Sequence, residues 1–268
     1  MHAISKTEWT MRFAARFGGF KIMAMPTTRV AIVAALDREI RPLVKRWDIN
    51  NREYEGRSFK FFENDPAVLV CGGIGAEAAR RACEAVIKLY QPHLVISAGF
   101  AGALDPELRV GRIVTPGSVI DANDGSRTKV SSGNGVLVSF DAVADAEQKL
   151  KLGKAYRADA VDMEAAAVAR GAGAHGIPFI AVKAISDEVG FAMPSLDKFV
   201  ASDGKFKAGR FVAFAAVRPG LWPGVVRLRA NTQKASRALC WALEEYTHGT
   251  QDLEQSEAGL HPISKIGT

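Results

Sequence analysis

Short apolar runs recur along the sequence, and helical segments separate them. The clearest runs are residues 30–36, 67–71, 93–100 and 178–186. Runs of this length and composition are typical of strands buried on both faces of a sheet. Weaker strand patterns occur at residues 112–120, 135–140 and 160–163, and helical patterns at residues 76–90, 144–152 and 164–175. The alternation predicts a three-layer α/β fold in which a mostly parallel mixed sheet is flanked by helices.

No segment of this pattern reads as a linker, so we interpret residues 29–248 as a single domain. Its C-terminal part is predicted to hold a helix at residues 207–217 and a second helix with one small or apolar face. The members of that face are Leu228, Thr232, Ala235, Leu239, Ala242 and Tyr246. We interpret residues 1–28 as a disordered or artefactual extension, the alternative being a basic amphipathic segment on a membrane. Residues 249–268 are interpreted as a polar tail.

The composition excludes several classes of protein. The chain has 268 residues, of which 48% are hydrophobic and 24% charged, so it is globular rather than disordered. No apolar stretch approaches the ~18 residues of a membrane-spanning helix. Three widely spaced cysteines and five histidines without ligand spacing predict neither disulfides nor a metal site. We therefore expect a cytoplasmic protein that needs no metal and no cofactor.

Positive charge is concentrated in residues 1–60 and 198–243, within a net charge of +6. Such regions bind nucleic acid, a phosphate-bearing substrate or an anionic membrane, or they simply face solvent. No nucleic-acid motif with interleaved aromatic residues accompanies them. We therefore expect no nucleic-acid partner.

Acidic residues follow three of the predicted strands. Glu39 follows the first run, Glu164 follows the strand at 160–163, and Asp187 follows the last run. Ligands of open α/β sheets bind at the carboxyl ends of the strands, so these side chains predict an acid–base site. Each acid also has a structural interpretation, as a residue of the first turn of a helix or as a cap.

A glycine-rich turn, Gly72–Gly73–Ile74–Gly75, follows the second run. Its spacing matches a dinucleotide fingerprint, but no acid ends the next strand to bind the ribose hydroxyls. We therefore disfavour a dinucleotide and expect the turn to present backbone N–H groups to an anion or a water.

Four segments in this order carry a resemblance to a known family. They read VAIVAALDREI, CGGIGAEAA, SAGFAGALDPELRVGRIVTPGSVID and AVDMEAAAVARGAGAHGIPFIAVKAISD. Over residues 29–189 the chain resembles the purine nucleoside phosphorylase/nucleosidase superfamily, and within it the methylthioadenosine/S-adenosylhomocysteine nucleosidases. The resemblance implies cleavage of the N-glycosidic bond of an adenine nucleoside, with release of the free base, by a homodimer without a cofactor.

The resemblance also implies roles for individual residues. Asp187 is the acid that protonates N7 of the departing purine, and Ser186 orients it. Such an acid has to keep its proton near neutral pH, which predicts an apolar surrounding for Asp187. Glu164 binds the ribose hydroxyls and Glu39 activates water. The remaining expected substrate contacts are Met163, Phe100, Gly102 and Val143, and the expected water or phosphate pocket is formed by Gly73, Gly75 and Lys183.

The sequence departs from the nucleosidases at Phe100, where they have a serine, and at Lys183, where they have an arginine. The stretch AVDMEAAAVA and segments 202–205 and 218–219 resemble instead the hopanoid-associated branch. This resemblance implies adenosylhopane, a lipid nucleoside, as substrate and contact with the inner membrane face. Hydrolysis is favoured because no Gly-Asp-Pro-x-Arg phosphate motif is present. The alternatives are a phosphate-dependent phosphorylase and a catalytically inactive nucleoside-binding relative.

Overall fold

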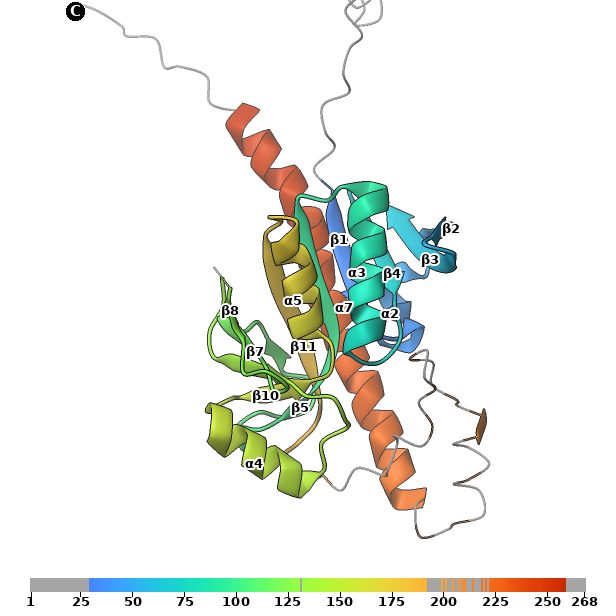
Figure 1. Ribbon diagram of the computed structural model, residues 1–268. Helices are drawn as coiled ribbons and strands as arrows, with labels where there is room; N and C mark the ends of the chain where they lie inside the picture. Colours follow the sequence, from blue (N-terminus) through green and yellow to red (C-terminus); the bar gives the residue numbers. More distant parts are fainter. Residues whose placement is uncertain are drawn as a thin grey trace, which may run out of the picture.

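One mixed sheet organises the protein, and strand β5 (Leu94–Ala103) lies at its centre (Figure 1). The computed structural model describes residues 29–130, 132–191 and 222–258, with scattered single positions between 199 and 220. The other strands with mostly buried residues are β1 (Val30–Ala34), β4 (Ala67–Cys71), β7 (Ser118–Asp121), β9 (Val136–Ser139), β10 (Ala160–Asp162) and β11 (Phe179–Asp187). These strands correspond to the apolar runs of the sequence.

Parallel and antiparallel pairs are mixed in this sheet, and β10 pairs parallel with β9 but antiparallel with β5. The path through the sheet is β2 (Asp48–Tyr54), β3 (Arg57–Asn64), β4, β1, β5, β10, β9, β7 and β8 (Arg127–Lys129), while β11 pairs with β5 and with β6 (Ile113–Val114). β4, β1, β5 and β11 are mutually parallel, with Ile32 opposite both Leu69 and Ile96. The carboxyl ends of β1, β5 and β11 therefore meet at one edge. The predicted α/β class with a mixed sheet is confirmed.

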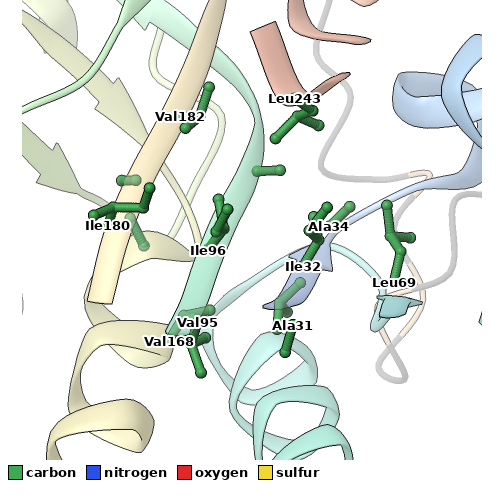
Figure 2. Packing of buried hydrophobic residues seen from close by; sticks show 14 of the residues in the cluster. Ala31, Ile32, Ala34, Leu69, Val95, Ile96, Val168, Ile180, Val182 and Leu243 are labelled. Atoms are coloured by element: carbon green, nitrogen blue, oxygen red, sulfur yellow. The ribbon is translucent and has the colours of Figure 1, made fainter. Parts of the chain in front are cut away.

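Helices cover both faces of the sheet. On one face, α3 (Ala76–Tyr90) and α5 (Ala165–Ala174) lie side by side, and on the other lies the long α7 (Trp222–Ala258) with α2 (Asp37–Val44) (Figure 1). Because neighbouring residues of a strand point to opposite faces, each central strand contributes to both layers. Figure 2 shows Val95 beside Val168 of α5, while Leu243 of α7 lies on the side of Ile32.

The predicted apolar face of α7 is confirmed. Ala235, Leu239 and Ala242 are buried against the body, while Leu228 and Thr232 line a pocket. The helix continues to Ala258, so the first ten residues of the predicted polar tail, 249–258, are helical.

No helix among the described residues combines the length and apolarity needed to cross a bilayer. The three cysteines are free thiols.

Several elements differ from the sequence-based prediction. β2 (Asp48–Tyr54) and β3 (Arg57–Asn64) form a hairpin whose turn residues Glu55 and Gly56 both have positive φ. Its first strand is polar and mostly exposed, so it gives no apolar signal. The expected single strand at 112–120 is two strands, because Pro116–Gly117 separates β6 (Ile113–Val114) from β7 (Ser118–Asp121). β8 (Arg127–Lys129) lies between β7 and β9, where no strand pattern is present in the sequence, and α4 spans Ala146–Tyr156. Residues 1–28 and most of the predicted helix at 207–217 lie outside the described residues.

Candidate active site

A pocket of about 390 Å³ opens at the sheet edge where β1, β5 and β11 end. Glu39, Glu164 and Asp187 all line it, so the structure brings the three predicted acids together. The other predicted substrate contacts in its wall are Met163, Ser186, Phe100, Gly102 and Val143. Of the expected water or phosphate residues, Gly73, Gly75 and Lys183 do not line it, whereas Ile74 of the same turn does.

Glu39 is buried in the first turn of α2, directly after β1, with 6% of its surface exposed. One carboxylate oxygen accepts a 3.4 Å hydrogen bond from the backbone N–H of Leu36. Burial and the nearby charge of Glu164 raise the pKa of Glu39 to about 7, against the opposing charges of Arg38 and Lys183. Glu39 therefore gains or loses a proton near neutral pH, which suits a general base. Glu39 also lies in the first turn of a helix, as the structural interpretation of this residue predicted.

Glu164 is held by the glycine turn. Its Oε1 accepts a 2.9 Å hydrogen bond from the backbone N–H of Gly75, a residue with φ of +96° that favours glycine. The N–H expected to face an anion or water thus holds a protein carboxylate instead. Asp162 caps α5 through the N–H of Ala165 at 2.8 Å, which leaves the Glu164 side chain to the pocket. Burial and the charge of Asp162 raise the pKa of Glu164 to about 7, although Lys183 opposes the shift.

Lys183 lies beneath the site and does not line the pocket. Its side chain is completely buried, and its ammonium group pairs with Asp162 at 2.8 Å. Burial alone would lower the pKa of Lys183, but the charges of Asp162, Glu164 and Glu39 hold it above its ordinary value. The expectation that Lys183 contacts water or phosphate in the pocket is therefore corrected. Lys183 is the counter-ion of Asp162, Glu164 and Glu39. The apolar pattern of its strand could not reveal this role.

Asp187 has partners on both carboxylate oxygens. Oδ1 accepts a 2.6 Å hydrogen bond from the Ser186 hydroxyl, which fixes the orientation of the carboxyl group. Oδ2 forms an ion pair with the ammonium group of Lys149. Lys149 also donates to the backbone carbonyl of Glu188 at 2.9 Å. The prediction of an apolar surrounding for Asp187 is therefore wrong on this side, because a buried cation faces it.

The sequence analysis misses Lys149, which lines the pocket from α4 and is only 1% exposed. The available signal was its spacing from Leu152, three residues later, because these two residues form the buried face of α4. It also misses the wall supplied by α7, where Val225 and Leu228 add apolar surface to that of Val143.

The arrangement separates three kinds of chemistry within one pocket. Glu39 and Glu164 form an acidic side that exchanges protons near pH 7. Lys149 and Asp187 form an ion pair elsewhere in the wall. Apolar residues of α7 form a further part of the wall. Such a pocket can hold a small polar molecule between a proton acceptor and a proton donor and shield it from water.

Residues 24–147 and 131–212 match the sequence model of the Phosphorylase superfamily, and the chain belongs to that family. It is an enzyme of the purine nucleosidase/phosphorylase superfamily. A relative from Marinomonas sp. (strain MWYL1), a 5′-methylthioadenosine/S-adenosylhomocysteine nucleosidase, is 26% identical over 204 residues, which cover 62% of this chain and 88% of the relative. An aminodeoxyfutalosine nucleosidase of Campylobacter jejuni is 24% identical over 217 residues, covering 67% and 95% of the two chains.

Solved structures show the same fold. The futalosine hydrolase of Helicobacter pylori aligns with a TM-score of 0.61 and 18% identity, covering 81% of this chain and 96% of the other. A 5′-methylthioadenosine/S-adenosylhomocysteine nucleosidase from Neisseria meningitidis, in complex with methylthio-immucillin-A, aligns with a TM-score of 0.60 and 19% identity, covering 80% and 95%. At these identities the likeness establishes the fold alone.

Proposed function

We propose that the protein hydrolyses the N-glycosidic bond of an adenine nucleoside and releases free adenine. The observation that carries the proposal is the meeting of Glu39, Glu164 and Asp187 around one pocket, with both glutamate pKa values near 7. The relatives named as nucleosidases support the same reaction class. Incubation with adenosine, 5′-methylthioadenosine and S-adenosylhomocysteine, followed by chromatography for free adenine, tests it. Binding of adenine without any product would support the inactive, nucleoside-binding alternative.

Each side chain has one task in this reaction. The C1′–N9 bond breaks, its electron pair moves to the purine, and positive charge grows on the ribose. Glu164 hydrogen-bonds the ribose hydroxyls, and its negative charge favours the cationic sugar. Glu39 takes a proton from the water that attacks C1′. The end of the pocket that holds Asp187 and Ser186 receives the purine, which needs a hydrogen bond or a proton at N7 to leave. Met163, Phe100, Gly102 and Val143 enclose the sugar and base.

Phosphorolysis is the second candidate, because Arg38 and Arg229 belong to the pocket wall and carry the charge that phosphate requires. Hydrolysis is favoured because Glu39 and Glu164 would both repel a phosphate dianion at the sugar. Product analysis separates the two reactions. Ribose released at equal rates with and without phosphate supports hydrolysis, whereas strict phosphate dependence with ribose 1-phosphate as product would replace it.

We propose further that the 5′ substituent is apolar and lipid-like, as in adenosylhopane. Val225 and Leu228 of α7 supply an apolar wall, and nearby Trp222 and Val226 are 54% and 67% exposed. We expect wild-type protein to release adenine from detergent-solubilised adenosylhopane. Leu228→Asp should reduce kcat/KM for the lipid about tenfold more than for adenosine, whereas Trp241→Ser, at a residue 70% exposed outside the pocket wall, should change neither. Cleavage of 5′-methylthioadenosine without cleavage of adenosylhopane would refute the lipid substrate alone.

The same hypothesis places the protein in the cytoplasm at the inner membrane face, as a homodimer. Flotation with vesicles of anionic phospholipid tests the membrane contact. Light scattering of the purified protein tests the dimer.

A further inference from the structure

A buried ion pair in the wall of the pocket suggests where the purine obtains its proton. Lys149 and Asp187 both line the pocket, and their charged groups contact each other. Asp187 already accepts from Ser186 at one oxygen and from Lys149 at the other. Both oxygens of Asp187 therefore accept, and the N–H bonds at this contact belong to Lys149.

We propose that the ammonium group of Lys149 is the proton donor to N7 of the leaving purine, with Asp187 as the carboxylate that holds it in place. The inference rests on the proposed nucleosidase function. In the step, the C1′–N9 bond breaks and its electron pair enters the purine ring. One proton moves from Nζ to N7, which leaves neutral adenine and a neutral lysine amine. The attacking water joins C1′ and gives its proton to Glu39, and the lysine regains a proton from solvent.

The local geometry indicates that Lys149 donates to a ligand and does not only stabilise the fold. An ammonium group has three N–H bonds, and two of those of Lys149 have partners among the described residues, Asp187 and the carbonyl of Glu188. The third N–H is available to a bound base. Gly102, also in the wall, makes room for this group, because a Cβ there would come within 3.0 Å of Cε of Lys149 and 3.1 Å of Oδ2 of Asp187.

The position of Lys149 on its helix argues the same way. Burying an ion pair gains little stability compared with an apolar pair of the same volume, so folding alone does not require a charge at this position. Lys151, two residues further along α4, shows the usual arrangement, since it is exposed and pairs with Glu147 at 2.7 Å. Lys151 is therefore a matched control on the same helix.

The decisive experiment measures the binding of adenine and 7-deazaadenine by calorimetry. The second ligand has a C–H in place of N7 and can neither accept a hydrogen bond nor take the proton. We expect wild-type protein to prefer adenine by a factor on the order of ten to a hundred, because the hydrogen bond involves a charged donor. Lys149→Met should reduce this preference to about threefold or less, and Lys151→Met should keep it. A preference that survives Lys149→Met would overturn the proposal, since a purely structural loss weakens both ligands alike.

Turnover supplies a second and independent test. A guanidinium group donates hydrogen bonds but does not release a proton, so Lys149→Arg should keep KM within a few-fold and lower kcat at least a hundredfold. Wild-type kcat in this variant would overturn the proposal even if Lys149→Met fails to fold. Wild-type protein that distinguishes adenine from 7-deazaadenine but cleaves no nucleoside would leave the contact standing and refute the proposed function.

Discussion

Replacing Glu39 by glutamine should make the protein more stable and inactive at the same time. The carboxyl group is buried, and its pKa is raised from 4.5 to about 7. A shift of this size corresponds to about 3 kcal/mol, at ~1.4 kcal/mol per pKa unit. The folded protein thus binds a proton here more tightly than the unfolded chain, so the free energy of unfolding falls as pH rises from about 4.5 to about 7. Above this window the full cost of the buried charge remains.

Glutamine has the same shape and no charge, so Glu39→Gln removes this cost. We expect the variant to exceed wild-type stability by about 2–3 kcal/mol at pH 8 and by almost nothing at pH 4.5. Urea unfolding at the two pH values, followed by circular dichroism, measures the difference. Asp37→Asn is the control, because Asp37 lies on the same helix but is exposed beside Lys60, and it should change stability by less than about 1 kcal/mol.

Activity provides the other half of the prediction. If Glu39 is the base, wild-type kcat should rise with pH through about 7, as the carboxyl group loses its proton. Glu39→Gln should lower kcat on the order of a hundredfold or more. A variant that retains the wild-type slope of stability against pH would refute the burial argument, and one that retains turnover would refute the assignment of the base.

Three further substitutions test the site. Asp187→Asn should abolish most turnover. It should also destabilise the fold by about 3 kcal/mol, because the buried ammonium group of Lys149 loses its partner. Urea unfolding should show that the double variant Asp187→Asn/Lys149→Met regains this stability. Glu164→Gln should raise KM for nucleosides but leave the affinity for free adenine unchanged. Steady-state kinetics measures the first and calorimetry the second, and an unchanged KM would contradict the role of Glu164. Gly102→Ala should lower kcat about tenfold by displacing the ion pair, and unchanged kinetics would show that the space at Gly102 is not needed.

Much of the fold follows from local sequence, because the central strands are apolar on both faces. The carboxyl ends of the parallel strands β1 and β11 must meet, so Glu39 and Asp187 could be grouped from the sequence alone, whereas Glu164 follows β10, which runs antiparallel to β5. The hairpin at Asp48–Asn64 could not be predicted in this way, since its first strand is polar and its pairing depends on β4. Its existence depends on the sheet edge rather than on its own composition.

The site residues that the sequence analysis misplaces are buried charges. Lys183 lies within an apolar run and Lys149 within a lysine-rich helix, and their partners Asp162 and Asp187 on other strands explain the burial of both charges. Helix α4 carries other lysines, and only the three-residue spacing from Leu152 distinguishes Lys149 from them. The N–H of Gly75 is likewise committed to Glu164, 89 positions away, a contact that spacing cannot reveal.

Helix α7 links the substrate end of the pocket to the catalytic end. Leu228 and Thr232 touch the cavity, and one turn later the hydroxyl of Ser236 donates to the backbone carbonyl of Glu39 at 2.9 Å. If Glu39 is the proposed base, a ligand that displaces the first turns of this helix would also displace the segment that carries the base. Substrates that lack the 5′ substituent would then have a lower kcat with little change in affinity. The preference for the 5′ substituent would appear in the rate at which the glycosidic bond is cleaved.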